Sequence, residues 1–280
     1  MCVELTNLKN KRTDHFNFME PILEVKQLTM DFGGLRALDH IDLDIGRGEI
    51  VALIGPNGAG KTTFFNCLTG IYPPSSGEMI ISPPGKSSKK INGLKPNHVT
   101  EAGLARTFQN IRLFKNMTVL ENVMMGRHCR ASSGIFGAIF RNPSTVREEK
   151  RIVQDSYAIL EKIGLVEFVD EFAKNLPYGA QRRLEIARAM ATDPFLLLLD
   201  EPAAGMNAQE TRDLDDLIIK IRDEEKISIL LIEHDMKLVM SLSDRIFVVD
   251  YGKKIAQGAP EEIKNNPDVI KAYLGEEIDA

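Results

Sequence analysis

The sequence predicts an α/β protein: a mostly parallel sheet flanked by helices, with an antiparallel β element and an inserted helical subdomain. Four continuous apolar runs indicate strands buried on both faces, as in parallel sheets; they are "EIVALI" (49–54), "FLLLLD" (195–200), "ISILLI" (227–232) and "RIFVVD" (245–250). Two earlier stretches alternate apolar and polar residues instead. About 140 residues separate the first run from the second, too many for a simple crossover between neighbouring strands.

The start of the chain is polar and has no clear period. We therefore expect residues 1–18 to form a flexible N-terminal extension and regular structure to begin near Met19. The alternating stretches that follow, "ILEVKQLTMDF" and "IDLDI", predict the antiparallel element. In the second stretch, three apolar side chains share one face and two aspartates the other: Ile41, Leu43 and Ile45 against Asp42 and Asp44.

A glycine-rich loop follows the first buried run directly. Its sequence, "GPNGAGKTT", matches G-x-x-x-x-G-K-[ST], and it lies between a predicted strand and a predicted helix. Backbone N–H groups in such a loop wrap phosphate oxygens, and the helix start adds its positive end. The loop predicts a P-loop NTPase core, with Lys61 on the β- and γ-phosphates and Thr62 on Mg²⁺. The predicted nucleotide-binding residues here are Gly55, Pro56, Asn57, Gly58, Ala59, Gly60, Lys61, Thr62 and Thr63.

Two acidic residues end the second buried run, "LLLLDEP". We expect this strand to lie beside the phosphate loop, so that Asp200 holds Mg²⁺ directly or through water. Glu201, one position further, is the candidate general base for a water in line with the γ-phosphate. The third run continues into "LLIEHDM", which brings His234 to the carboxyl end of its strand, where such sheets bind ligands. His234 is the candidate sensor of the γ-phosphate.

The region between the first two runs contains the predicted helical subdomain, about residues 113–190. In "VREEKRIVQDSYAILEKIGL" the apolar residues recur at helical spacing: Ile152, Tyr157, Ile159, Leu160 and Ile163. The stretch "RASSGIFGAIFRNPS" interrupts it as a loop or interaction surface. After the second run, "AQETRDLDDLIIKIRD" predicts a helix that covers the sheet through one apolar stripe: Leu214, Leu217, Ile218 and Ile221.

The order and spacing of the phosphate loop, the "DEP" strand and the histidine resemble those of the ATP-binding subunit of an ATP-binding cassette (ABC) transporter. The resemblance implies a cassette domain over residues 19–257, followed by a short C-terminal helical segment over 258–280. It also implies that Gln109 in "RTFQN" contacts Mg²⁺ and links the catalytic core to the helical subdomain. Phe32 in "MDFGG" stands where the family stacks an aromatic ring on adenine. ATP and Mg²⁺ are the implied cofactors.

"LPYGAQRR" occupies the family's signature position, usually Leu-Ser-Gly-Gly-Gln, which contacts the ATP of the other subunit. Tyr178, Gly179 and Ala180 are therefore nucleotide-contact candidates across a subunit interface, with Pro177 in place of the usual serine and Ala180 in place of glutamine. Asn207 in "AAGMN" joins them, standing where an aspartate is common. These departures concern the partner's nucleotide, whereas the chain's own site matches the family throughout. We expect a weakened but working contribution and a heterodimer with a second ATPase subunit, a homodimer being the alternative.

Further stretches resemble the larger ATPase subunit of importers for branched-chain or hydrophobic amino acids, among them "MTVLENVMMGRH", "DEPAAGMN" and the terminal "NNPDVIKAYLG". The resemblance implies integral membrane permease subunits as partners and, indirectly, a solute-binding protein. The apolar segment after Gln109 is the candidate contact to the permease. ATPases of urea, other amide or other solute importers are closely similar, so the solute stays open.

Charge and composition bear on nucleic-acid binding and on the location of the protein, and two other classes of P-loop protein remain as alternatives. The net charge of -5 gives no electrostatic basis for nucleic-acid binding. Three irregularly spaced cysteines and the lack of a long apolar run favour a cytoplasmic protein. The family resemblance implies that it is peripheral on the inner membrane face through a permease. A soluble cassette ATPase of the iron–sulfur assembly or repair type is the second hypothesis. A P-loop kinase or GTPase is the third, although no N-K-x-D motif occurs and the signature stretch has no role there.

Overall fold

The computed structural model describes residues 21–130 and 143–278, and all structural statements refer to these. The predicted extension 1–18 and most of the predicted loop at 130–144 lie outside them. The strands are β1 (Leu23–Phe32), β2 (Leu35–Ile45), β3 (Ile50–Ile54), β4 (Ser76–Ile81), β5 (Lys89–Lys90), β6 (Leu104–Arg106), β7 (Leu196–Asp200), β8 (Ser228–Ile232), β9 (Arg245–Asp250) and β10 (Lys253–Gly258). The helices are α2 (Lys61–Leu68), α3 (Pro96–Glu101), α4 (Val119–Arg127), α6 (Pro143–Ile163), α7 (Tyr178–Met190), α8 (Ala208–Glu225), α9 (Met236–Leu242), α10 (Pro260–Lys264) and α11 (Pro267–Ile278), with short 3₁₀ turns at 128–130, 166–168 and 173–175.

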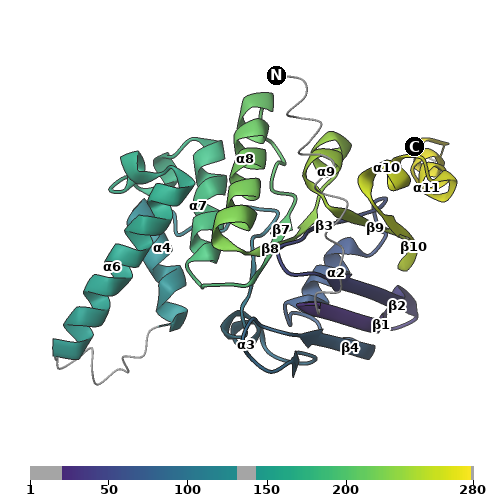
Figure 1. Cartoon of the computed structure of the whole chain (residues 1–280). Coiled ribbons are helices and arrows are strands. Elements are labelled where there is room, and N and C mark those ends of the chain that lie inside the picture. Colours follow the sequence, from purple (N-terminus) through teal and green to yellow (C-terminus); the bar gives the residue numbers. More distant parts are fainter. Residues whose placement is uncertain (1–20, 131–142, 279–280) are drawn as a thin grey trace, which may run out of the picture.

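The strands form two sheets, as predicted. The larger has the order β10-β9-β3-β8-β7-β6, parallel except for the pairing of β10 with β9. The smaller has the order β2-β1-β4-β5 and is antiparallel. Figure 1 shows the smaller sheet below the larger one, with α2 between them and α8 and α9 on the other side.

The four predicted runs are β3, β7, β8 and β9, and they are buried as expected. Residues of β3 alternate between two hydrophobic cores: Ile50, Ala52 and Ile54 pack with the helical layer, and Val51 and Leu53 pack toward the antiparallel sheet. The alternation predicted at residues 41–45 is also confirmed, because the three apolar side chains are buried and the two aspartates are half-buried.

Two features of the strand order were not predicted from the sequence. The strand that ends at Asp200 does not lie next to the strand of the phosphate loop, because β8 pairs with both and separates them. Moreover, the interval between the first two runs contains β6, a strand of the main sheet that pairs with β7. With three residues, β6 is too short to give a pattern in the sequence.

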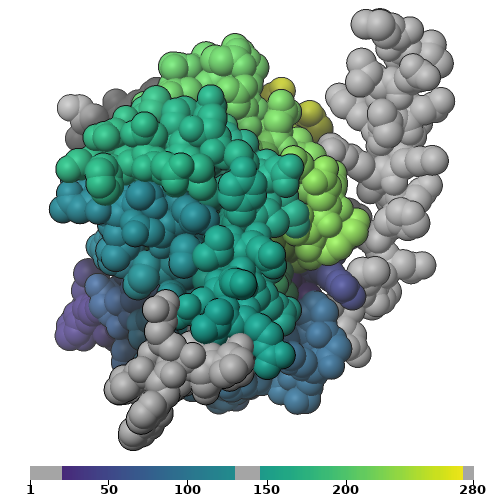
Figure 2. Space-filling model, turned by 90° about the vertical axis from the view of Figure 1, so that its left-hand side faces the viewer, coloured from purple at the N-terminus to yellow at the C-terminus, as the bar shows by residue number. Residues whose placement is uncertain are grey.

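The helical subdomain extends from one end of the sheet, where α4, α6 and α7 pack together (Figure 1). Figure 2 looks onto this end and shows that its teal surface covers much of this face. On α6, Ile152, Leu160 and Ile163 are buried as predicted, but Tyr157 is 44% exposed. Ser156, one position earlier, is buried instead, so the inward stripe is less apolar than the spacing indicated.

Side chains at the helix starts explain several element boundaries. Thr118 and Glu121 form a capping box at α4, and Asn207 and Glu210 form another at α8. All four stripe residues predicted on α8 are buried. The C-terminal segment contains α10 and α11, which begin at Pro260 and Pro267, as expected for proline in a first helical turn. Within the described ranges, no helix combines the length and apolarity that crossing a bilayer requires.

Candidate functional site

The phosphate loop leaves the carboxyl end of β3 and enters α2, and close approach of its backbone explains its glycines. Gly55 has φ 154°, and a Cβ there would lie 2.0 Å from the carbonyl oxygen of Val249. Gly60 has φ 101°, and a Cβ there would lie 2.6 Å from the carbonyl oxygen of Ala37. Neither position accommodates a side chain. The loop is therefore fixed against β2 and β9 where it leads into α2.

Lys61 begins α2 and is buried by its own loop. Its Nζ donates hydrogen bonds to the carbonyl oxygens of Gly55, at 2.5 Å, and Pro56, at 2.7 Å. The ammonium group is thus held against the backbone of the phosphate loop.

A cleft of about 620 Å³ opens in front of the loop and brings together most of the predicted residues. Gly55 and Pro56 do not line it, since they lie behind Lys61. Leu35, Arg36, Ala37, Tyr251 and Gly252, which carry no recognisable motif, complete the walls. From the predicted set the cleft is lined by Phe32, Asn57, Gly58, Ala59, Gly60, Lys61, Thr62, Thr63, Gln109, Glu201 and His234.

Phe32 lies at the end of β1 with its ring 41% exposed. The ring of Tyr72 meets it edge to face, with the ring centroids 5.3 Å apart. Phe32 thus lines the cleft while it is in contact with Tyr72.

Glu201 lies between two of the other predicted catalytic side chains, those of Gln109 and His234. Gln109 Nε2 donates to its Oε2 at 2.7 Å, and His234 Nε2 lies 2.8 Å from its Oε1. Its backbone has φ 47°, a left-handed conformation that is unfavourable for a glutamate. Residues from three segments far apart in the sequence therefore converge on one carboxylate at the mouth of the cleft.

Glu233 joins these segments and was missed by the sequence reasoning, because the adjacent histidine carries the recognisable signal. Its side chain is buried and accepts hydrogen bonds from the backbone N–H groups of Ala203, at 2.8 Å, and His234, at 3.1 Å. Burial raises the pKa of this carboxyl group, against the lowering effect of its backbone hydrogen bonds. Glu233 thus fixes the loop after β7 against the loop after β8.

Asp200 is buried at the end of β7 and does not line the cleft. Its Oδ2 accepts a 2.7 Å hydrogen bond from Arg106 Nη2, and no described group donates to Oδ1. Thr107, next to Arg106, accepts a long 3.5 Å hydrogen bond from the backbone N–H of Asp200. The predicted metal ligands Thr62, Gln109 and Asp200 thus belong to three different elements around the loop.

The signature residues lie outside the cleft, at the start of α7. Tyr178 O–H donates to the carbonyl oxygen of Ala204 at 2.8 Å. A Cβ on Gly179 would lie 2.8 Å from Glu210 Oε1, which explains the glycine by close packing. The Ala180 side chain is buried in the core. The buried methyl group leaves only the backbone of Ala180 for the expected contact with a neighbour's nucleotide, which stays a prediction.

Asn207 also has a local role that its motif did not indicate. Its Oδ1 accepts hydrogen bonds from the backbone N–H groups of Gln209, at 2.9 Å, and Glu210, at 3.0 Å, which makes it the N-cap of α8. Both asparagine and aspartate can form such a cap, so the change to asparagine preserves the local structure.

A buried ion pair connects α7 to the segment around Gln109. Arg182, 1% exposed, donates to the carbonyl oxygens of Phe108, at 2.8 Å, and Gln109, at 2.7 Å, and pairs with Glu185. Glu185 also accepts a hydrogen bond from the backbone N–H of Arg112 at 3.2 Å. Desolvation raises the pKa of Glu185. The i,i+3 spacing of arginine and glutamate in "RRLE" was the only sequence signal for this pair.

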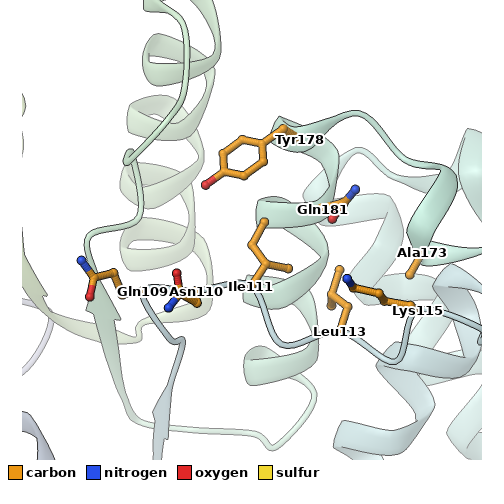
Figure 3. Close-up of a pocket in the computed structure, with 8 residues that line it drawn as sticks. All are labelled: Gln109, Asn110, Ile111, Leu113, Lys115, Ala173, Tyr178 and Gln181. Atoms are coloured by element: carbon orange, nitrogen blue, oxygen red, sulfur yellow. The ribbon is translucent and has the colours of Figure 1, made fainter.

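A second pocket lies between this segment and the start of α7 (Figure 3). The figure shows Tyr178 on one side and the chain from Gln109 to Lys115 on the other. Its lining mixes apolar and polar side chains: Gln109, Asn110, Ile111, Leu113, Lys115, Ala173, Tyr178 and Gln181.

Comparison with known proteins agrees with this geometry. The family model described as "ABC transporter" matches residues 38–204, and that described as "Branched-chain amino acid ATP-binding cassette transporter" matches residues 253–279. The high-affinity branched-chain amino acid transport ATP-binding protein LivG of Escherichia coli K12 is 50% identical over 92% of this chain and 99% of its own length. BraF of Pseudomonas aeruginosa, which has the same description, is 50% identical over 91% of this chain and 98% of its own length.

Solved structures show the same fold. The ADP conformation of MJ1267, an ATP-binding cassette of an ABC transporter, superposes with a TM-score of 0.79 at 29% identity, covering 92% of this chain and all of its own. A nucleotide-free ATP-binding cassette from an ABC transporter gives a TM-score of 0.77 at 31% identity, covering 90% of this chain and 98% of its own. The fold is thus that of a P-loop NTPase cassette, and the chain belongs to the ABC transporter family.

Proposed function

We propose that this protein hydrolyses ATP to power a membrane importer of branched-chain or other hydrophobic amino acids. The observation that carries the proposal is the position of Glu201, held by Gln109 and His234 at the mouth of the cleft that contains the phosphate loop. A carboxylate so placed can orient water and accept its proton while the loop holds the phosphates.

Nucleotide binding is assigned to the cleft. The N–H groups of the loop and the start of α2 bind the phosphates, and Lys61, already directed toward the loop, adds its charge. Phe32, which lines the cleft, would stack on the base. Tyr178, Gly179 and Asn207 are proposed to face the nucleotide of another subunit, through backbone and hydroxyl groups rather than through the side chain of Ala180.

The donor set fits Mg²⁺, which prefers oxygen ligands. Thr62 offers a hydroxyl at the start of α2, Gln109 an amide oxygen and Asp200 a carboxylate whose Oδ1 accepts no hydrogen bond from a described group. When bound, the ion would neutralise phosphate charge. The chain's own part in the reaction is carried by Glu201, which accepts the proton of the attacking water, and by His234 and Gln109, which fix the orientation of that carboxylate.

The pocket in Figure 3 supports a contact with a permease. It is open, lies on the segment that Gln109 begins, and is bounded by the start of α7. Gln109 donates a hydrogen bond to Glu201, and its carbonyl oxygen accepts one from Arg182 on α7. A movement of Glu201 on ATP binding or hydrolysis would therefore reach this surface through these two hydrogen bonds. We assign the pocket to a cytoplasmic helix of the permease.

The solute assignment rests on the names of the relatives that match nearly the whole chain at 50% identity. With it come a second ATPase subunit, an indirect link to a solute-binding protein, and a location on the inner face of the cell membrane through the permease.

The test is leucine uptake into proteoliposomes that contain this chain with its permease and partner ATPase. In Glu201→Gln, we expect ATP to bind with parental affinity while hydrolysis and uptake both stop, because the amide accepts no proton. Filter-bound radioactive leucine, released phosphate and bound ATP are the three measurements.

Glu78→Gln is the matched control, since Glu78 is an exposed carboxylate on the antiparallel sheet that pairs with Lys90; it should leave all three quantities unchanged. Hydrolysis by Glu201→Gln at the parental rate would refute the role of Glu201. ATP hydrolysis without leucine uptake by the parent would refute the solute assignment alone.

A further inference from the structure

Arg106, the last residue of β6, joins the two halves of the nucleotide site. Its Nη2 donates to Asp200 Oδ2 at 2.7 Å, and its Nη1 donates to Asn66 Oδ1 at 2.7 Å and to Thr69 Oγ1 at 3.3 Å. Asn66 and Thr69 lie at the end of α2, the helix that begins with the phosphate loop. One guanidinium group thus spans from that helix to the carboxylate proposed to bind Mg²⁺.

The surroundings of Arg106 hold it in one position. The side chains of Arg106 and Asp200 are 7% and 5% exposed. The guanidinium carbon lies 5.4 Å from the ring centroids of both Phe65 and Phe108. Its Nε is buried and has no hydrogen-bond partner among the described residues. A buried ion pair with an unpaired donor is a weak means of stabilising a fold. The burial of Arg106 beside Asp200 therefore calls for an explanation other than stability.

We infer that Arg106 is a positioning residue for the metal-binding carboxylate, an inference that rests on the proposed function. It occupies Oδ2 of Asp200 and fixes the rotation of the carboxylate, which leaves Oδ1 as the oxygen available to Mg²⁺. Groups that hydrogen-bond a metal ligand in this way orient it, and their loss typically lowers metal affinity about 10- to 100-fold.

Arg106 has two opposite effects on a cation, and they can be separated. Its positive charge disfavours a second cation nearby, whereas its hydrogen bonds place the ligand correctly. Arg106→Lys keeps the charge but cannot reach Asp200 and Asn66 together, because an ammonium group lacks the planar fork. Arg106→Gln removes the charge as well.

The experiment measures binding of a fluorescent ATP analogue, mant-ATP, to the full chain in EDTA and over a series of Mg²⁺ concentrations. For Arg106→Lys we expect parental affinity in EDTA and a Mg²⁺ midpoint about 10- to 100-fold higher. For Arg106→Gln we expect a shift in the same direction. A lower midpoint in Arg106→Gln would show that charge outweighs positioning and would overturn the inference.

Arg245→Lys is the matched control. Arg245 is another largely buried arginine with two carboxylate partners, Asp44 and Glu49, but it lies at the opposite end of the sheet, at the start of β9. It should leave the Mg²⁺ midpoint unchanged even where stability falls, which separates positioning from a merely structural role.

Asn66→Ala keeps the experiment decisive if Arg106→Lys does not fold. It removes only the 2.7 Å anchor of Nη1 and should raise the Mg²⁺ midpoint by a smaller factor. An unchanged midpoint in both Arg106→Lys and Asn66→Ala would refute the inference. If binding by the parent does not respond to Mg²⁺ at all, the proposed nucleotide site fails instead.

Discussion

The surroundings of Glu201 determine both its backbone conformation and the orientation of its side chain. Its left-handed backbone, φ 47°, is unfavourable. It is maintained because the N–H of Glu201 donates to the carbonyl oxygen of Ile232, while the side chain is held by Gln109 and His234. Backbone strain of this kind costs about 1–3 kcal/mol and gathers at functional sites. The sequence predicted the three side chains but contains no signal for the strained conformation.

Asp215, on α8, yields a prediction about pH. Burial, followed by the like charges of Asp216, Asp235 and Glu233, raises its pKa to about 6, and its Oδ1 is buried without a hydrogen-bond partner among the described residues. An acid whose pKa is raised by folding favours the folded state when neutral. The stability it contributes is therefore present at low pH and is lost as the pH rises through about 6.

We accordingly expect Asp215→Asn to raise the melting temperature at pH 7.5. The gain should shrink toward zero near pH 4, where the carboxyl group of Asp215 in the folded protein is neutral like the amide that replaces it. Differential scanning fluorimetry between these pH values measures it. Asp216→Asn, at the exposed neighbouring position, should give a smaller gain. An equal gain for Asp215→Asn at both ends of the range would contradict the assignment.

At the scale of elements, the turn between β9 and β10 places an aromatic residue in an unfavourable conformation. Tyr251, with φ 42°, and Gly252, with φ 76°, have the consecutive positive φ values of a type I′ turn. Hydrogen bonds from Gly252 N–H to the carbonyl oxygen of Ala59 and from Asp39 N–H to that of Gly252 fix the turn beside the phosphate loop. The side chain of Tyr251 is 87% exposed and gains little from packing.

Tyr251→Asn should therefore stabilise the nucleotide-free protein by about 0.5–1 kcal/mol, because asparagine tolerates positive φ better than tyrosine. Urea unfolding followed by circular dichroism measures the change. Tyr157→Asn is the comparison, since Tyr157 is an exposed tyrosine inside α6; there the same substitution should lower stability slightly. A loss of stability in Tyr251→Asn would show that the tyrosine contributes contacts that outweigh its backbone cost.

The elements differ in how well the sequence predicts them. β3, β7, β8 and β9 were predicted because burial on both faces leaves a continuous apolar run. β6 was missed because it has three residues and is defined by its pairing with β7, which is a contact distant in the chain. For the same reason the order of the strands, with β8 between β3 and β7, could not be inferred from local patterns.

At the scale of the whole molecule, the chain offers a fuller site to its own nucleotide than to a neighbour's. Most of the residues proposed to bind this chain's own nucleotide line one cleft, whereas the start of α7 has Pro177 as its N-cap, with neither a hydroxyl nor an N–H, and the Ala180 side chain is buried in the core. Fewer donors therefore remain for a phosphate of another subunit. This asymmetry favours pairing with a different ATPase chain.

The corresponding prediction concerns the oligomeric state. Glu201→Gln with Mg·ATP should remain monomeric in sedimentation velocity and should form a one-to-one complex when the second ATPase subunit is added. Restoring the usual residue by Pro177→Ser should increase self-association. A stable homodimer of the unmodified signature sequence with ATP would contradict the heterodimer.

Gln109 is attached at both of its ends, by its amide to Glu201 and by its backbone carbonyl to Arg182. A movement of Glu201 is therefore passed to the backbone of Gln109 as long as both hydrogen bonds persist, and the hydrogen bond that breaks first decides which side Gln109 stays with. Because Arg182 is buried whereas Glu201 lines the cleft, we expect the hydrogen bond to Glu201 to break first. Gln109 would then stay with the helical subdomain, because Arg182 on α7 holds its backbone carbonyl.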